Sequence, residues 1–450
     1  MPFVGGVFTP FFRTPPLPAP PARHGFVRPP VSLVPALEEE VTRTTPAGDT
    51  IVPTSSGTVQ PSFNNAGWIA SSPSGRVLLC FAYQEGRGRR LAVWTRHPTV
   101  GWYRVDVDAY VGRGNVTSPT VRAVPGREDH FGLAFGLDGA IAYRELRFTG
   151  RAYGLYAAWD HAVPGTQFDT PSLAHTSGGA AWVAAGATNR LGVPSIHLVR
   201  GDNRGIVPVT LPVTSPPSLP SLAIGATGGG LASATTGVVA WRELDVPGSQ
   251  AFYTTVVAAF AVPVLGRPRG FTVQDLAGYR VDGSSAWDPG VAFDGNGFLA
   301  AWQRRPRGSR QPIIWNAGSL DGVTWTTAGE VCDLSIRTQN HFAHVAADPE
   351  SDLATLVWEG TGGGPKLAST AVARLSRTRA TTLAPADQYA SPRGDNGLAD
   401  DARLPVSSLV GPLPDATWPA VCIAGGRLHL AWFAKPNGDN CTLRYREATW

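Results

Sequence analysis

Nine polar or aromatic residues stand immediately before, or at the start of, apolar segments that recur along the chain. They are Asn64, Thr117, Asp169, Ser218, Trp287, Asp288, Asn340, His341 and Trp418. Amide and carboxylate groups can hydrogen-bond the hydroxyls of a sugar, and aromatic faces can pack against its C–H groups. We therefore predict a ligand-binding site formed by Asn64, Asp169, Trp287, Asp288, Asn340, His341 and Trp418. The alternative is that Asp, Asn, Ser and Thr at these positions serve only the turns in which they stand.

The sequence contains no motif for metal, cofactor or nucleophile chemistry. The nine histidines show neither His-x-His nor His-Glu-x-x-His spacing. On a strand, His341 and His344 would point to opposite faces, which argues against a shared metal ion. The glycine runs 228–230 and 362–364 are not followed by the Lys-Ser or Lys-Thr of a phosphate loop. We predict no catalytic residue, no metal site and no cofactor.

Arginine supplies almost all of the positive charge, and the net charge is only +4. Arg144-Glu145 and Arg242-Glu243 each follow an apolar run, and we predict that both are surface ion pairs. Arginine clusters at 87–90 and 304–310 stand in loops without interleaved aromatic residues, so no nucleic-acid partner is predicted.

The elements that must position these residues repeat seven times. Each repeat opens with Pro-x-apolar, at Pro61, Pro119, Pro171, Pro220, Pro289 and Pro419, with Ala343 in place of proline in the sixth. Each closes with a small residue and an aromatic, namely Ala82-Tyr83, Ala134-Phe135, Ala181-Trp182, Ala240-Trp241, Ala301-Trp302, Val357-Trp358 and Ala431-Trp432. Such self-similarity indicates one small unit that cannot bury its apolar face alone.

The fifth repeat predicts the shape of that unit. Apolar runs at 287–293, 298–303 and 312–317, with a fourth at 323–326, are separated by short turns such as Asp294-Gly295-Asn296-Gly297. Four antiparallel strands in a meander, repeated in a ring, make a β-propeller. The loops before the innermost strands of such a ring line one mouth of its central channel, and we predict the ligand-binding site there. We predict an all-β, seven-bladed β-propeller, with blades that begin near 61, 119, 171, 220, 289, 343 and 419.

The last repeat is too short for a whole blade. From Pro419 onward it supplies three strands, at 420–424, 427–433 and 442–448. We predict that residues 41–58 add the closing strand next to 442–448, so that the propeller spans 41–450. Residues 376–416 form a long polar insertion, and insertions of this length are commonly functional or disordered.

Residues 1–40 are rich in proline and carry five phenylalanines. This composition predicts an extended, polyproline-like arm that anchors the propeller to protein partners. The apolar start lacks a basic segment and is interrupted by proline, so no secretory signal is predicted, and no membrane span is long enough. Cys422 and Cys441 are predicted on non-neighbouring strands, and whether they are bridged is left open.

One short motif resembles a known family. Ser319-Leu320-Asp321-Gly322-Val323-Thr324-Trp325 is similar to the Asp-box of sialidase-like and lectin-like propellers, with one residue fewer between Asp and Gly. The resemblance implies a structural turn remote from any active site, and it supports the propeller fold. A sialidase would also need three carboxylate-binding arginines and a Tyr/Glu pair, which cannot be assigned.

We predict a non-enzymatic recognition or structural module. The all-β fold and the arm favour a component of a larger assembly such as a virion or a tail appendage, able to bind cell-surface glycans. A sialidase-like glycan-processing hydrolase and a protein-binding scaffold are the two alternatives. A virion or extracellular location follows from the first interpretation alone.

Overall fold

The structure is a computed structural model of the chain. It describes residues 31–33, 50–52, 57–60, 67–97, 101–112, 114–202, 205–211, 213, 217–227, 234–246, 252–263, 267–308, 312–325, 329–330, 339–348, 353–361, 368–376, 389–390, 413–414, 416–437 and 440–449. Strands dominate these residues, with only two helical turns, α1 (Asp108–Val111) and α2 (Tyr279–Asp282). No helix in the described part of the chain is long and apolar enough to cross a membrane.

Four of the sheets are four-stranded antiparallel meanders. The first comprises β8 (Val116–Ala123), β9 (His130–Leu137), β10 (Ala140–Phe148) and β11 (Tyr153–His161). The second comprises β12 (Thr166–His175), β13 (Ala181–Asn189), β14 (Pro194–Asp202) and β15 (Gly205–Leu211). The third comprises β16 (Pro217–Thr227), β17 (Ala234–Val246), β18 (Phe252–Ala261) and β19 (Arg269–Gly278). The fourth comprises β20 (Ser285–Phe293), β21 (Phe298–Arg305), β22 (Ile313–Ser319) and β23 (Gly329–Glu330).

Two larger sheets complete the described strands. One contains β24 (Gln339–Ala347), β25 (Leu353–Thr361), β26 (Ala368–Ser376), β27 (Tyr389–Ala390) and β28 (Leu413–Pro414). The other contains β29 (Ala416–Ala424), β30 (Arg427–Asn437), β31 (Asn440–Thr449), β1 (Val31–Leu33), β2 (Thr50–Ile51), β3 (Gly57–Gln60), β4 (Ile69–Ser71), β5 (Val77–Glu85), β6 (Gly88–His97) and β7 (Gly101–Val105). The prediction of an all-β propeller with four-stranded antiparallel blades is confirmed.

The predicted count of seven separate blades is wrong, because the described strands form six sheets. The difference arises where the ring closes. Strand β1 pairs in parallel with β31 and antiparallel with β3, and β3 pairs with β5. The meander β29–β31 and the meander β4–β7 are therefore joined by backbone hydrogen bonds into one ten-stranded sheet.

A strand from the N-terminal side does complete the last meander, as predicted. Thr50 and Ile51 of β2 pair with Tyr445 and Arg444 of β31, and the Val52 amide donates to the Leu443 carbonyl at 2.9 Å. The fully buried side chain of Val52 adds an apolar contact at this junction. Both ends of the chain thus hold the circle closed.

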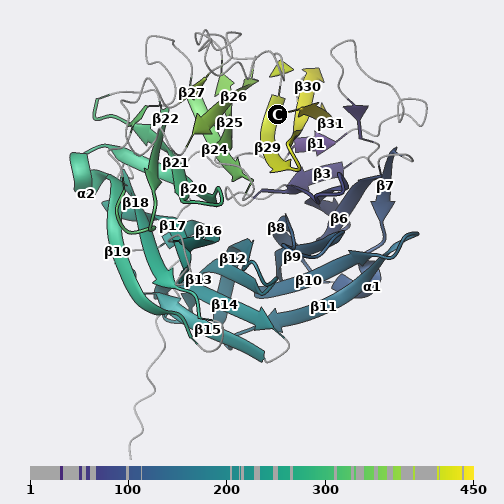
Figure 1. The fold of residues 1–450 in the computed structure, drawn as a ribbon, viewed down its shortest axis with the longest axis horizontal. Coiled ribbons are helices and arrows are strands. Elements are labelled where there is room, and N and C mark those ends of the chain that lie inside the picture. The colour runs from purple at the N-terminus through teal and green to yellow at the C-terminus, as the bar shows by residue number, and fades with distance from the viewer. Residues whose placement is uncertain are drawn as a thin grey trace, which may run out of the picture.

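The innermost strands form a closed circle of neighbours (Figure 1). Contacts run from β4 to β8, β12, β16, β20, β24 and β29, and from β29 back to β4. Apolar side chains between successive sheets form the core, with Trp182, Trp241, Trp302 and Trp432 among the largest fully buried residues. Because each sheet presents both faces to its neighbours, strands apolar on both faces are the ones that fit this architecture.

Most of the repeat marks belong to a β-bulge in an innermost strand. In β8, the pairs Thr117–Gly136 and Thr120–Ala134 enclose Ser118 and Pro119 on one strand and only Phe135 on the other. The same two-against-one register shift occurs in β12, β16, β20, β24 and β29. Proline is tolerated there because a bulged residue makes no ladder hydrogen bond.

The pairing of β12 with β13 contradicts one of the predicted repeat closings. In the third repeat Ser172 pairs with Ala184, so Ala185 opposes the bulge. Ala181-Trp182 begins β13 and does not mark its bulge partner. The predicted opening at Pro61 lies outside the described residues, and the first meander uses β3 and β4 against β5 instead.

Side chains just after the bulge link successive sheets. Ser172 accepts from the Leu222 amide at 2.9 Å, and Ser221 accepts from the Val291 amide at 3.1 Å. His344, in the equivalent position of β24, accepts from the Val421 amide at 3.1 Å through Nδ1. These bonds satisfy buried backbone donors that no ladder partner reaches.

Most of the predicted arm and insertion lies outside the described residues. Within residues 1–40 only Val31–Leu33 is described, as strand β1 of the ten-stranded sheet. Within 376–416, the short strands β27 and β28 both pair with β26. Cys422 and Cys441 lie on β29 and β31, which are not neighbours, and they are not bridged.

Candidate functional site

The bulges define the local geometry of the predicted ligand-binding residues. The residue before the bulge proline has a positive φ in five strands, at Ser118, Thr170, Leu219, Asp288 and Trp418. Left-handed backbone at residues other than glycine costs about 1–2 kcal/mol each, so the surrounding packing must impose it. The residue before the bulge proline is therefore a strained position that is repeated around the ring.

The structure does not gather the predicted residues around an open site. Trp287, Asp288 and Trp418 are buried, which leaves their side chains little exposed surface. Asp169 is exposed. Asn64 lies outside the described residues, and for Asn340 and His341 only the backbone pairing with Gly360 and Glu359 is described.

Two of the nine residues singled out from the sequence, Ser218 and Asp288, are brought together by Arg242. Arg242 donates to Ser218 Oγ at 2.7 Å and to Asp288 Oδ1 at 3.0 Å. Gln303 donates to Asp288 Oδ2 at 2.8 Å. Asp288 thus has both carboxylate oxygens occupied, and this cluster clamps the β16–β19 sheet to the β20–β23 sheet.

The two predicted surface ion pairs are corrected by the structure. Glu145 and Glu243 are buried, and neither pairs with the arginine next to it in sequence. Glu243 binds Arg280 at 2.7 Å, while Arg144 binds Asp160 at 2.6 Å. Adjacent residues on a strand point to opposite faces, so Arg144 and Glu145 reach different partners.

The buried Glu145 supports a pocket on the β8–β11 sheet. A cavity of about 510 Å³ is lined by Arg127, Glu128, Asp129, His130, Arg147, Phe148 and Tyr156. The turn before β9 supplies the first three of these residues, β9 begins at the fourth, His130, and the β10–β11 hairpin supplies the rest. The Tyr156 ring is 52% exposed, and it contacts the His130 ring edge-on with centroids 4.7 Å apart.

Glu145 orients two of the pocket residues from beneath. Its Oε1 accepts from His130 Nδ1 at 2.7 Å and from Arg127 Nη1 at 2.9 Å. Its Oε2 accepts from the Tyr143 hydroxyl at 3.4 Å. Burial, and next the negative charge of Glu145, raise the pKa of Tyr143 well above its usual value. With Nδ1 of His130 donating, Nε2 is the nitrogen left to act on a ligand.

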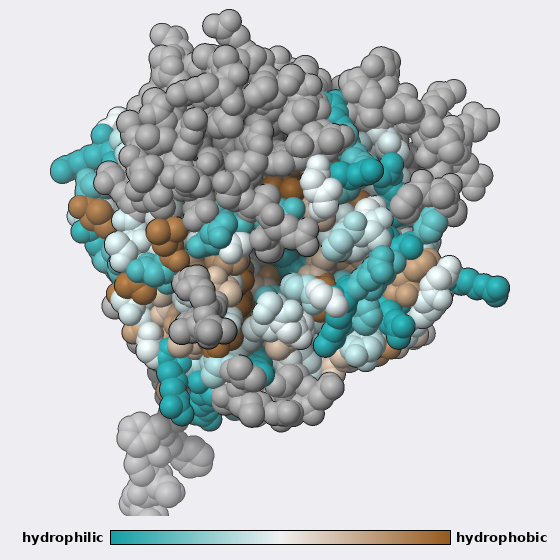
Figure 2. Space-filling view, viewed as in Figure 1, coloured by the Kyte–Doolittle hydropathy of each residue, from teal (hydrophilic) through white to brown (hydrophobic). Residues whose placement is uncertain are grey.

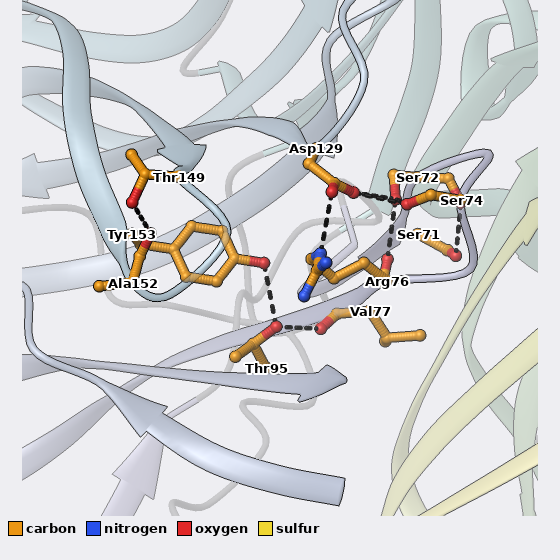
Figure 3. Close-up of polar contacts among 10 residues, drawn as sticks. All are labelled: Ser71, Ser72, Ser74, Arg76, Val77, Thr95, Asp129, Thr149, Ala152 and Tyr153. Carbon is orange, nitrogen blue, oxygen red and sulfur yellow. Dashed lines mark hydrogen bonds and ion pairs between the residues drawn. The ribbon is translucent and has the colours of Figure 1, made fainter. Parts of the chain in front are cut away.

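Asp129 fixes the wall of the pocket (Figure 3). It accepts from Ser72 at 3.0 Å and from Ser74 at 2.5 Å, and it pairs with Arg76 at 3.1 Å. The Arg76 guanidinium also lies 3.6 Å from the centroid of the Phe148 ring. The turn between β4 and β5 is thereby attached to the β8–β11 sheet.

A second, smaller pocket lies on the other side of that turn. A cavity of about 260 Å³ is lined by Pro73, Ser74, Gly75, Arg96, Ala424, Gly425, Arg427 and Glu447. Glu447 binds both Arg96 and Arg427. These ion pairs outweigh the effect of burial and lower the pKa of Glu447.

The sequence contained a signal for this arrangement that the prediction missed. Tyr-Arg-Glu occurs twice, at 143–145 and 445–447. In both copies the tyrosine hydroxyl reaches the glutamate at 3.4 Å, and a side chain from the preceding strand, His130 or Arg427, binds the same glutamate. The histidine and arginine partners could not be predicted, because strand register decides which residue lies opposite.

The Asp-box-like segment forms a closed polar turn between β22 and β23. Asp321 accepts from the Val323 and Thr324 amides at 2.8 and 2.7 Å, and Ser319 accepts from the Gly322 amide at 2.8 Å. Although burial alone would raise it, these hydrogen bonds lower the pKa of Asp321. With its carboxylate engaged in this way, the segment serves as a turn.

The visible face of the ring carries its hydrophilic side chains mainly over the β8–β11 sheet, with smaller apolar patches near α2 and β19 (Figure 2). Val273, Tyr279 and Val281 account for exposed apolar surface at those two elements. No group of three His, Cys, Asp or Glu side chains in the described ranges could hold a metal ion. The His341–His344 alternation assumed from sequence is broken by the bulge between them.

No family model matches the chain, and no curated protein matches it in sequence. Among solved structures, the chain is similar to a protein of unknown function from Dyadobacter fermentans DSM 18053, at 12% identity over 87% of this chain and 98% of that chain, with a TM-score of 0.44. It is similar to the polysaccharide lyase Uly1 at 10% identity over 93% and 97% of the two chains, with a TM-score of 0.46.

A thermostable family-43 glycoside hydrolase is similar at 12% identity over 59% of this chain and 90% of that chain, with a TM-score of 0.33. At these identities and scores the likenesses carry no argument about an activity or a site. The predicted resemblance to sialidase-like propellers stays a prediction.

Proposed function

We propose that the protein is a recognition propeller that binds a glycan, without processing it, in the pocket between Arg127 and Tyr156. The observation that carries the proposal is the exposed Tyr156 at a pocket whose other lining residues, apart from Phe148, carry hydrogen-bonding side chains. An aromatic face with convergent polar groups is the usual composition of a sugar site. The proposal moves the ligand away from the channel mouth predicted from sequence, where Trp287 and Trp418 are buried.

The charges of the pocket favour a neutral sugar. Arg127 and Arg147 are balanced by Glu128 and Asp129 among the lining residues, so a charged ligand gains no net attraction. Within the described residues, Arg147 and Glu128 are exposed and have no hydrogen bond or ion pair to protein. A guanidinium donor and a carboxylate acceptor are thereby available for sugar hydroxyls.

A glycan array with purified protein tests the proposal. Tyr156→Ala is expected to weaken binding of any bound glycan at least about tenfold, because an aromatic contact is worth roughly 1.4 kcal/mol or more at a binding hot spot. Tyr279→Ala is the matched control, since Tyr279 is similarly exposed at 42% but lies on α2, away from the pocket. An array on which wild type binds nothing, or equal losses in both variants, would contradict the proposed site.

The second candidate is a glycan-processing hydrolase, and the His130–Glu145 contact of 2.7 Å favours it. His130 would accept a proton from water at Nε2, and the buried carboxylate would stabilise the resulting imidazolium. Release of reducing ends from a bound glycan, lost in His130→Gln, would support this candidate over pure recognition. Binding without release by wild type would exclude it for that glycan.

Attachment to a larger assembly through residues 1–40 remains a prediction from composition, as does a virion or tail-appendage origin. Most of this segment lies outside the described residues. A scaffold that binds a protein has no specific support from the described surface.

A further inference from the structure

Arg122 breaks a pattern of small residues at one position of the innermost strands. It is the third residue after the bulge proline in β8, an innermost strand. The equivalent residues of the other five bulged strands are Ala174, Ala223, Ala292, Ala346 and Cys422. A long cationic side chain therefore stands where every other bulged strand presents a methyl or a thiol.

Among the described residues, no carboxylate compensates this guanidinium. Within the described part of the chain Arg122 makes no ion pair and no hydrogen bond, although it is only partly exposed. The positive charge of Arg122 lowers the pKa values of four ionisable groups, Cys80, Cys422, His175 and His344. Burial lowers the pKa of Arg122 to about 10. A desolvated charge without a counter-charge is unfavourable, so such groups are normally paired.

His344 supplies a second donor without an acceptor. Its Nδ1 accepts the Val421 amide, so the neutral ring carries its hydrogen on Nε2. The side chain is buried, and Nε2 has no partner within the described residues. A buried N–H without an acceptor indicates an ion or a water molecule that satisfies it.

Both donors converge beside Gly67, at the start of the β4 region. A Cβ on Gly67 would lie 2.5 Å from Arg122 Nη1 and 2.8 Å from His344 Nε2. The Gly67 carbonyl is turned away, because it accepts from the Val121 amide at 3.3 Å and from Thr120 Oγ1 at 2.8 Å. The two donors pack against the same glycine, where no larger residue would fit, and they therefore lie close enough together to reach one small ligand.

We propose that the protein holds a small inorganic anion of halide size among its innermost strands, between Arg122 Nη1 and His344 Nε2. The site accepts an anion because both groups donate and no carboxylate in the described ranges faces them. It favours a small anion because the donors approach the same point beside Gly67. A bound anion would connect β8 with β24 across the β29 and β4 positions of the circle, a role separate from glycan binding.

Bromide is the probe, and its ⁸¹Br NMR line width in the presence of the full-length protein is the measurement. Wild type is expected to broaden the line, and added chloride is expected to reverse the broadening. Arg122→Gln should lose most of this excess width. Arg269→Gln, which removes an exposed arginine on β19, should keep it. Equal broadening by Arg122→Gln and wild type would overturn the proposal.

A crystal of the wild-type protein soaked in bromide keeps the test decisive if Arg122→Gln does not fold. An anomalous peak within hydrogen-bonding distance of both Arg122 Nη1 and His344 Nε2 is expected. Density for water alone at that point, with bromide elsewhere in the crystal, would overturn the proposal. Glycan binding is unaffected by either result, because the pocket near Tyr156 shares no residue with this site.

Discussion

At the scale of single residues, strain is concentrated just before the bulge prolines. Thr170 has φ of 46° although its side chain is β-branched, and Leu219 has φ of 54°. Such conformations persist only where neighbouring contacts impose them. Here the contacts are the paired strand on one side and the hydrogen bond to the next sheet on the other, as at Ser172 and Leu222.

The substitution Leu219→Ile tests this strain. It conserves volume and hydrophobicity but places a β-branched side chain at positive φ, so the free energy of unfolding should fall by about 1–2 kcal/mol. Leu137→Ile is the matched control, since Leu137 is also partly buried but pairs regularly with Val116 and Ala140 in strand β9, where the change should stay within about 0.5 kcal/mol. Urea unfolding of the three proteins measures both values, and equal effects would refute the explanation.

At the scale of elements, strand β31 shows how the ring avoids an open edge. It pairs with β30 within the last meander and with β1 and β2 from the other end of the chain. An unpaired edge strand would expose a row of backbone donors and acceptors. The short strands β1 and β2 therefore matter more than their length indicates.

Truncation tests this closure. Removal of residues 1–53 deletes β1, β2 and the buried Val52, and should lower the free energy of unfolding by at least about 3 kcal/mol from lost apolar burial and backbone pairing. Removal of residues 1–30 deletes no described strand and is expected to leave stability within about 0.5 kcal/mol. Thermal or urea unfolding compares the two. Equal stability of the 1–53 deletion and wild type would show that the closing strands are dispensable.

At the scale of the whole molecule, buried neutral histidines make the ring sensitive to acid. Burial, together with Arg122, lowers the pKa of His175 and of His344 to about 3. For His429, burial lowers the pKa to about 4, although Glu447 opposes the shift. At pH values below the ordinary histidine pKa of 6.5, these histidines bind protons in the unfolded chain but stay neutral in the folded protein. Stability from these groups is therefore complete above pH 6.5 and declines as the pH falls toward 4.

The substitution His175→Gln isolates one such histidine. Between pH 6 and 4, each histidine that is protonated only in the unfolded chain lowers the free energy of unfolding by about 1.4 kcal/mol per pH unit. The stability of the variant should therefore fall less steeply than that of wild type by about this amount. Urea unfolding at several pH values gives both slopes. Only the difference in slope is diagnostic, because the loss of the His175–Tyr143 contact lowers the variant's stability at every pH. Parallel slopes would mean that His175 is protonated in the folded protein.

The sequence by itself determined the fold class, because its repeat is local. Pro-x-apolar and the small-aromatic pair are two sides of one bulge, which adjacent strands form through short-range pairing. That signal was enough for an all-β ring of meanders and for the closing strand beside Tyr445. It was not enough for the number of separate sheets, since β1 joins two meanders through pairings between opposite ends of the chain.

Only the tertiary structure decided which polar groups meet. The bulges interrupt the alternation of side chains along a strand, so the sequence spacing of His341 and His344 does not show which face of the strand each occupies. The neighbours of Glu145 and Arg122 depend on strand register and on ring closure, which bring Gly67 to Arg122 and His344. Polar side chains carry no local signal of their partner, because the favourable contact is made between strands distant in sequence. The candidate sites therefore had to be found in space.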